Sequence, residues 1–396
     1  MFSSRFTYQK QKNRLVGAWE QKKKQNEPVL DLTLSNPTVA GFTYNEQAIL
    51  KSLANPDSLE YHPLPKGMYS ARVAVARYYA QTHNLPVDPE MLFLTASTSE
   101  AYAYLFKQLA DPGDEILIPV PGYPLFDFLA ELECVKHTGY RCRYDASGFH
   151  IALDMLRHTI STKTRAIVVV NPGNPTGAYL KKEEIAGLNE LCNEYGLALI
   201  VDEVFLDFAG PSVSNGYFTA CANDRCLTFV LSGLSKILGM PQMKLAWISV
   251  NGPEALRIEA AQRLEFIADT YLSVSSAVQG AAPGLLAERE HIQKQIVDRC
   301  NTNERHLKAL LAKTASCQML LREGGWYAIV KLPPQSNDET VAYQVLVENN
   351  LYVHPGYFYD FMERNYLVLS LLTQEEVFLK GIEILVKKVD EKKYDK

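Results

Sequence analysis

The chain has 396 residues, of which 47% are hydrophobic, and its formal net charge at pH 7 is -5. A chain of this length and composition can bury cores for two domains, which excludes an intrinsically disordered protein. The small negative charge gives no reason to expect nucleic acid or an anionic membrane surface as a partner.

The seven cysteines show no repeated spacing, which suits reduced thiols in a cytosol better than a disulfide framework. No cysteine or histidine pairs lie at the spacing of a zinc site, so we expect no metal. Met1–Lys24 is basic without the apolar core of a signal peptide, and no later run is long enough to cross a membrane. We favour a solvated amphipathic arm over a transit peptide for this segment, and we expect a cytoplasmic protein.

The pattern changes along the chain from isolated elements to βα repeats. Val29–Leu34 alternates apolar and polar residues and predicts a half-buried strand, and Ser70–Tyr79 predicts a helix with Ser70 as its cap. From residue 91 on, apolar runs alternate with helical segments, which is typical of an α/β fold with a mainly parallel sheet between helices. The predicted strands are Met91–Leu94, Glu115–Pro119, Ala166–Val170, Leu197–Val201, Leu227–Leu231 and Leu245–Val250. The predicted helices are Thr98–Ala110, Lys181–Glu194, Pro253–Ile267 and Gly284–Lys313.

From about residue 315 the pattern is that of an α+β domain. The predicted elements are strands at Gly325–Val330, Tyr352–His354 and Tyr366–Leu371 and a helix near Val341–Asn349. We therefore divide the chain into an N-terminal arm with the start of a small domain (1–45), a large domain (46–285) and a small C-terminal domain (286–396).

Ligands of open α/β sheets bind beyond the carboxyl ends of the strands, so the residues after each predicted strand are candidates for a site. Thr95–Glu100 is a hydroxyl-rich turn that opens a helix, where free N–H groups and the helix dipole favour a phosphate. A simple helix cap explains the same residues equally well. Tyr123, between Gly122 and Pro124, can stack on a flat cofactor, although loop packing is the commoner role of such a tyrosine.

Three later strand ends carry reactive or polar side chains. In the turn Asn171–Gly177, prolines and glycines fix two amides, and Asn174 can donate to a phenolate oxygen. Asp202 follows a buried run and needs a partner, which is either a protonated pyridine nitrogen or a structural cation. Lys236 follows another apolar run; it is either a surface lysine or, if it loses hydration, a Schiff-base former. Lys244 is a second cation that can hold a phosphate.

Taken together, Asn171-Pro-Gly-Asn-Pro-Thr-Gly177, Val201-Asp-Glu-Val204 and Ser235-Lys236 resemble the class I/II aminotransferases of the fold-type I pyridoxal-phosphate family. The resemblance runs from about Leu30 to Leu371. It implies an aspartate-aminotransferase-like fold, with a mainly parallel seven-stranded-type sheet between helices and a smaller α+β domain. It further implies that Lys236 binds pyridoxal 5'-phosphate covalently.

The resemblance also assigns roles to the other candidates. Asp202 would pair with the cofactor's ring nitrogen, Asn174 would bond the ring hydroxyl, and Tyr123 would stack on the ring. The phosphate would be held by Ser97, Thr98, Ser99, Lys244 and either Ser235 or Ser232. Tyr61 looks like the residue that reaches the phosphate of a neighbouring subunit, so a homodimer is implied. The implied reaction moves an amino group between an amino acid or amine and a 2-oxo acid, with Lys236 as base and then acid.

Three positions depart from the family. Phe205 replaces a tyrosine that donates to the ring oxygen, which is worth roughly 1.5–3 kcal/mol and predicts that the lysine–cofactor link stays protonated to higher pH, by about one to two units. Lys244 replaces a phosphate-binding arginine and loses its bidentate geometry. Val368 replaces the arginine that clamps the substrate α-carboxylate, and Ser35 replaces a glycine beside it.

The Val368 departure leaves two explanations. Either another cation takes over the clamp, for which Arg322, Arg364 and Lys66 are the candidates, or the donor lacks a free α-carboxylate. The same fold and cofactor also serve lyases and decarboxylases, and the altered positions are compatible with a binding protein without turnover. These readings remain as alternatives to transamination.

Overall fold

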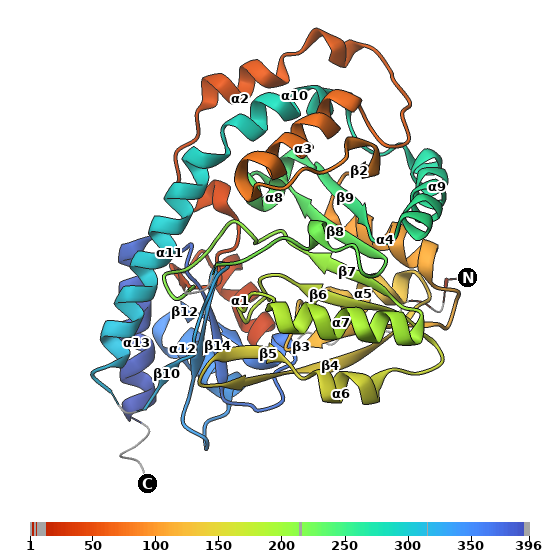
Figure 1. Ribbon diagram of the computed structural model, residues 1–396. Helices are drawn as coiled ribbons and strands as arrows, with labels where there is room; N and C mark the ends of the chain where they lie inside the picture. Colours follow the sequence, from red (N-terminus) through yellow and green to blue (C-terminus); the bar gives the residue numbers. More distant parts are fainter. Residues whose placement is uncertain (1, 4, 6–12, 214–215, 315, 392–396) are drawn as a thin grey trace.

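The computed structural model describes residues 2–3, 5, 13–213, 216–314 and 316–391, and an eight-stranded sheet lies at its centre (Figure 1). The strand order is β2-β9-β8-β7-β6-β3-β4-β5. Neighbours from β8 through β4 run parallel, β9 is antiparallel to both its neighbours, and β5 forms a hairpin with β4. The strands are β2 (Leu92–Thr95), β3 (Glu115–Val120), β4 (Lys136–Asp145), β5 (Gly148–Ile151), β6 (Thr164–Val170), β7 (Ala198–Asp202), β8 (Thr228–Gly233) and β9 (Ala246–Asn251).

Helices cover both faces of this sheet, because alternate strand residues point to opposite sides. Ile118, Val168 and Ile200 belong to a core that includes residues of α4 (Thr98–Leu109), α5 (Phe126–Leu132) and α9 (Glu254–Tyr271). Their strand neighbours Leu117, Val169 and Val201 belong to a second core, shared with α3 (Tyr69–His83), α6 (Leu153–Thr159) and α7 (Lys182–Tyr195). The predicted mainly parallel α/β architecture is confirmed.

The sheet has one more strand than the predicted seven-stranded type. All six strands predicted from apolar runs are present, whereas the β4–β5 hairpin was not predicted. The reason is that β4 lies toward the edge of the sheet and most of its residues are exposed or partly exposed, so it contains no continuous apolar run.

A second, four-stranded antiparallel sheet is built from the C-terminal part of the chain, in the order β10-β11-β14-β13. Its strands are β10 (Gln318–Met319), β11 (Tyr327–Lys331), β13 (His354–Pro355) and β14 (Tyr366–Ser370). Helices α11 (Arg289–Leu311) and α13 (Glu375–Glu391) pack side by side next to it, and α12 (Asp338–Asn349) contacts α13 and β14 (Figure 1). The predicted α+β pattern of this region is present.

Three local predictions were wrong. The helix predicted at Gly284–Lys313 is interrupted at Glu288, which separates α10 (Ser276–Ala287) from α11. Helix α3 begins at Tyr69 after Met68, so Ser70 is not its cap. The strand predicted at Val29–Leu34 is reduced to β1 (Leu30–Asp31), which pairs with β12 (Leu351–Tyr352).

The N-terminal arm is packed against the C-terminal region instead of being solvated. Helix α1 (Arg14–Lys24) contacts α12; Leu15 is fully buried, and the Trp19 ring stacks on Tyr352 with 4.4 Å between ring centres. Phe6, which was expected to share this role, lies outside the described residues. Helix α2 (Glu46–Leu53) follows and packs on α10. Of the helices in the described ranges, none is both long enough and apolar enough to cross a bilayer.

Candidate active site

The carboxyl ends of β6, β7 and β8 meet at one edge of the large sheet and open into a common cavity. Asn174 follows β6, Asp202 ends β7, and Lys236 lies in α8 (Leu234–Ile237) just after β8. All three line this cavity, as do three other predicted residues: Thr98, Tyr123 and Ser235. The parallel arrangement of the strands is what brings these side chains together, since it places their carboxyl ends on the same edge.

Burial changes the basicity of the Lys236 amine. Loss of hydration lowers the pKa of Lys236 to about 8, and the negative charge of Asp202 partly opposes this. The Nζ atom lies 5.0 Å from the ring centre of Trp326 and 5.4 Å from that of Phe205. At pH 7 roughly one amine in ten is then neutral and nucleophilic, about 300 times more than at the ordinary lysine pKa.

Asp202 is buried in the wall of the same cavity and carries the charge opposite to that of Lys236. Its Oδ2 accepts a hydrogen bond from the Tyr102 hydroxyl at 3.1 Å and its Oδ1 accepts one from the Val204 N–H at 3.1 Å. Burial raises the pKa of Asp202 to about 6, while these two hydrogen bonds and the charge of Lys236 act in the other direction. A carboxylate in this position is stabilised by a cation in the cavity, which fits a protonated pyridine nitrogen.

The two amides of the 171–177 turn have different roles. Asn171 holds the turn in place: its Nδ2 donates to Glu203 Oε1 at 3.2 Å, and its Oδ1 accepts from the Leu180 N–H at 3.0 Å. Asn174 instead lines the cavity, and its buried Oδ1 has no hydrogen-bond partner among the described residues. Because a buried polar atom without a partner is costly, the Asn174 Oδ1 is available to accept a hydrogen bond from a ligand.

The turn before α4 contains both a helix cap and a residue of the cavity wall. Ser97 is the helix cap, and its Oγ accepts from the Glu100 N–H at 3.2 Å, whereas Thr98 lines the cavity at the positive end of the helix dipole. Ser99 is not among the lining residues. Of the two serines near Lys236, Ser235 lines the cavity, whereas buried Ser232 donates to the Glu203 carbonyl at 3.5 Å.

Two further predicted cofactor residues, Lys244 and Tyr61, also lie outside the cavity of their own chain. Lys244 is exposed, with a left-handed backbone (φ 51°), and does not line the cavity. Tyr61 is 74% exposed and lines a separate groove with Gln279 and Ser273.

None of the three cations proposed to replace the arginine clamp lines the cavity. The buried Arg322 is held by Glu304, with Nε 2.7 Å from Oε2. Lys66 lies 3.5 Å from Glu90 and 3.4 Å from Glu265. Arg364 lies over the Tyr357 ring, 4.5 Å from its centre. Each of these three cations therefore contacts an acidic or aromatic side chain outside the cavity.

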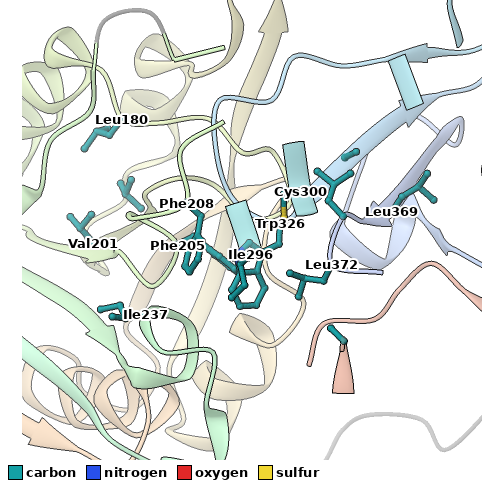
Figure 2. Close-up of a cluster of buried hydrophobic side chains, with 14 of the residues drawn as sticks. Leu180, Val201, Phe205, Phe208, Ile237, Ile296, Cys300, Trp326, Leu369 and Leu372 are labelled. Atoms are coloured by element: carbon teal, nitrogen blue, oxygen red, sulfur yellow. The ribbon is translucent and has the colours of Figure 1, made fainter. Parts of the chain in front are cut away.

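Two of the positions that depart from the family, 205 and 368, are occupied by buried apolar side chains. Phe205 is 3% exposed, and its ring meets Trp326 edge-on at 5.1 Å, next to Phe208 (Figure 2). Val368 is 1% exposed and belongs to an apolar cluster with Phe149 and Ile329, which we call the Val368 cluster. Its full set of buried members is Phe149, Leu320, Ile329, Tyr359, Phe361, Tyr366 and Val368.

Sequence reasoning missed one wall of the cavity. Tyr327 of β11 lines it opposite the sheet edge, together with Ser35. Burial raises the pKa of Tyr327, so its hydroxyl stays protonated at neutral pH. The sequence around Tyr327 predicts a strand but does not indicate a site, because only the packing of the second sheet brings β11 to the cavity. Phe126 of α5 and Val204, two residues after Asp202, also line the cavity and were not singled out from the sequence.

The fold and this constellation of lysine, aspartate and asparagine define a pyridoxal-phosphate-dependent enzyme of fold type I. The family model "Aminotransferase class I and II" matches residues 27–377, so the chain belongs to that family. Pyridoxal phosphate is the cofactor of the family, and the chain is a transaminase.

Named relatives support this conclusion. The chain is 29% identical over 281 residues to glutamate-pyruvate aminotransferase AlaA of Haemophilus influenzae, covering 71% of this chain and 69% of the relative. It is 25% identical over 372 residues to a tyrosine aminotransferase of Dictyostelium discoideum, covering 92% and 84%. The solved alanine aminotransferase of Pyrococcus furiosus has the same fold, with a TM-score of 0.88, 22% identity and coverage of 99% and 100%. These names support transamination over elimination, decarboxylation or loss of activity.

Proposed function

We propose that Lys236 is the residue that binds pyridoxal 5'-phosphate covalently and that it is also the proton carrier of the transamination. The observation that carries this proposal is the position of the Lys236 amine, which shares a cavity with Asp202 and has a pKa near 8. When the substrate amine has displaced it, this amine is close enough to neutrality to take a proton from the substrate Cα. The bound cofactor supplies the electron sink for the electron pair left behind.

The other predicted residues hold the cofactor. Asp202, oriented by Tyr102 and the Val204 N–H, keeps a proton on the ring nitrogen. Asn174 lines the same cavity, and its Nδ2 donates to the oxygen on the ring. Tyr123 stacks on the ring. The phosphate takes hydrogen bonds from Ser97, Thr98, Ser99 and Ser235 at the N-terminus of α4, where the helix dipole favours an anion.

Phe205 and Trp326 act on the Lys236 amine through their rings. They surround it with apolar surface, so water is kept from the Nζ atom and the neutral form is favoured. This explains why two buried aromatic residues lie beside the only lysine among the described residues of the cavity wall.

We further propose a cytoplasmic homodimer with the domain division given above. Tyr61 supports the dimer because it is exposed within its own chain and can reach the phosphate of a neighbouring subunit. Lys244 is proposed as a further ligand of the phosphate. The interruption between α10 and α11 at Glu288 supports a boundary near residue 286. The pairing of β1 with β12 supports grouping the N-terminal segment with the C-terminal domain.

Borohydride reduction of the reconstituted protein tests the central proposal. We expect the cofactor to become irreversibly attached to the peptide that contains Lys236, and turnover of a donor to require a 2-oxo acid acceptor. Attachment to another lysine would remove Lys236 from its role. Release of ammonia without an acceptor would identify elimination instead of transfer.

A further inference from the structure

The proposed chemistry does not use the carboxylate of Glu203, although this residue directly follows Asp202. Its side chain is 2% exposed and does not line the active-site cavity. The two neighbouring carboxylates face different sides of the sheet. Asp202 accepts a hydrogen bond from Tyr102 of α4, whereas Glu203 interacts electrostatically with Tyr79 and His83 of α3. Glu203 is therefore a buried ionisable group placed behind the cofactor site.

Three hydrogen bonds from neutral donors hold the Glu203 carboxylate. Its Oε1 accepts from the Asn171 Nδ2 at 3.2 Å and from the Ala220 N–H at 2.7 Å, and its Oε2 accepts from the Thr219 hydroxyl at 2.5 Å. Burial raises the pKa of Glu203 to about 7, while these hydrogen bonds and His83 act in the other direction. A proton on Oε2 still leaves Oε1 able to accept, so the contact with Asn171 exists in both protonation states.

The Asn171 amide connects Glu203 to the turn after β6. Besides its bond to Glu203, the Nδ2 donates to the Phe218 carbonyl at 3.2 Å, and the Oδ1 accepts from the Leu180 N–H at 3.0 Å. Every hydrogen-bonding atom of this amide side chain therefore has a partner. The acceptor oxygen of Glu203 fixes the direction of the amide, because a reversed amide would place two acceptors against each other.

Asn174 lies inside the segment that the Asn171 amide closes. Two backbone bonds narrow this segment further: the Gly173 N–H donates to the Ala178 carbonyl at 2.9 Å, and the Gly177 N–H donates to the Gly173 carbonyl at 2.7 Å. The direction of the Asn174 side chain in the cavity therefore depends on how Asn171 is held at the base of the turn.

The Glu203 backbone also joins the strand ends that carry the site. The Asn171 N–H donates to the Asp202 carbonyl at 2.8 Å, and the Glu203 N–H donates to the Leu231 carbonyl of β8 at 2.8 Å. Asn171, Glu203 and Thr219 are each at most 5% exposed within a single chain. These contacts therefore do not depend on a neighbouring subunit.

We propose that Glu203 is a positioning residue, which fixes the Asn171 amide and thereby the direction in which Asn174 presents its own amide to the oxygen on the cofactor's ring. This inference rests on the proposed function, because it depends on the role proposed there for Asn174. Without the Glu203 acceptor the Asn171 amide is released from its fixed direction, and Asn174 loses its alignment with the ring oxygen.

Two forms of the cofactor test this inference without turnover. Cofactor-free protein is titrated with pyridoxal 5'-phosphate and with 3-deoxypyridoxal 5'-phosphate, which lacks the ring oxygen, and binding is followed by protein fluorescence. We expect Glu203→Met to bind pyridoxal 5'-phosphate at least fivefold more weakly than the unchanged protein, since it loses about one hydrogen bond to the cofactor. The 3-deoxy form should bind within twofold of the unchanged protein. Equal weakening of both ligands would mean that Glu203 only stabilises the fold, which overturns the inference.

Asn174→Ala shows whether Glu203 acts through Asn174. This variant should have the same selective loss, and the double variant Glu203→Met with Asn174→Ala should bind both ligands as Asn174→Ala does. Additive losses in the double variant overturn the inference and leave the proposed role of Asn174 standing. If Asn174→Ala weakens both ligands equally, the role of Asn174 and the inference fail together. Borohydride attachment at Lys236 tests the rest of the proposed function separately.

Two further variants separate positioning from stability. Glu203→Gln keeps an acceptor for Asn171 and should restore both affinities to within twofold; a Glu203→Gln protein that behaves like Glu203→Met contradicts the proposal. Asn189→Ala is the matched control, because buried Asn189 of α7 exchanges hydrogen bonds with Asn223, at 3.0 and 2.8 Å. It should leave both affinities unchanged. If Glu203→Met does not fold, Asn171→Ser removes the other partner of the contact and should show the same selective loss.

The absorbance of the loaded protein gives an independent readout. A hydrogen bond to the ring oxygen lowers the pKa of the lysine–cofactor link, so its loss in Glu203→Met should raise that pKa by about half a unit or more. Glu203→Gln and Asn189→Ala should both titrate like the unchanged protein. An unchanged pKa in Glu203→Met would show that Asn174 keeps its direction without Glu203, and the inference would be wrong.

Discussion

The two walls of the active-site cavity differ in charge. The wall made by the large sheet carries Asp202 and Lys236, and burial moves the pKa of both groups toward neutrality. The opposite wall carries Ser35 and Tyr327, which are uncharged, with Val368 buried behind them. The comparison teaches that the charged groups of the cavity come from the large sheet, whereas the second sheet contributes an uncharged tyrosine.

The largest expected effect is on the charged wall. Lys236→Ala should lower the rate of transamination by roughly 10⁴-fold or more, because it removes the covalent attachment and the proton carrier together. Steady-state kinetics and borohydride attachment measure the loss. Lys294→Ala, at an exposed lysine of α11, is the control and should keep full activity. Appreciable activity in Lys236→Ala would mean that another base acts in the charged wall.

The next largest effect concerns Arg322, whose charge is paired with Glu304 outside the cavity. Arg322→Met leaves the buried Glu304 carboxylate with Lys308 as its remaining cation, and should lower the free energy of unfolding by about 3–5 kcal/mol. Urea unfolding measures this change, and the double variant with Glu304→Gln should recover most of it. If Arg322→Met instead keeps its stability and selectively loses carboxylate-bearing donors, Arg322 is the substrate clamp and the wall is not neutral.

A smaller effect is expected where the two walls meet. Phe205→Tyr places a hydroxyl beside the Lys236 amine, in the position where the family has a donor to the ring oxygen. The added hydrogen bond should lower the pKa of the lysine–cofactor link by about one to two units, which corresponds to roughly 1.5–3 kcal/mol. A spectrophotometric pH titration of both proteins measures the shift. An unchanged pKa would show that the hydroxyl is turned away from the cofactor.

The smallest effect is the pH dependence of cofactor attachment. Only the neutral amine reacts, so the attachment rate of the cofactor-free protein should rise about tenfold per pH unit up to about pH 8 and then level off. Asp202→Asn removes the negative charge that favours the protonated amine, so its profile should level off at lower pH. Stopped-flow absorbance between pH 6 and pH 10.5 checks both profiles, since a rise that continues to pH 10 would indicate a solvated lysine.

The fold and the family could be predicted because their signals are local. Apolar runs such as Ala166–Val170 form the buried strands, and the turns after them carry the polar residues of the family motifs. The same local reasoning failed at the β4–β5 hairpin, because the exposed residues of β4 form no apolar run. It also failed at Glu288, because one interrupted helical turn does not change the pattern of apolar residues. The predicted site residues were only partly brought together, since Lys244 and Tyr61 lie outside the cavity of their own chain.

The sequence by itself determined the α/β class, the family and the lysine and aspartate that lie at the ends of neighbouring strands, because a strand and the residue after it are adjacent in the chain. Only the tertiary structure decided which cations are free and which wall of the cavity is neutral. Arg322 could not be assigned from sequence, since its partner Glu304 lies on a separate helix. Tyr327, Cys142 and Val368 come together around the site from three different strands, and packing between the two sheets, not proximity in the chain, places them there.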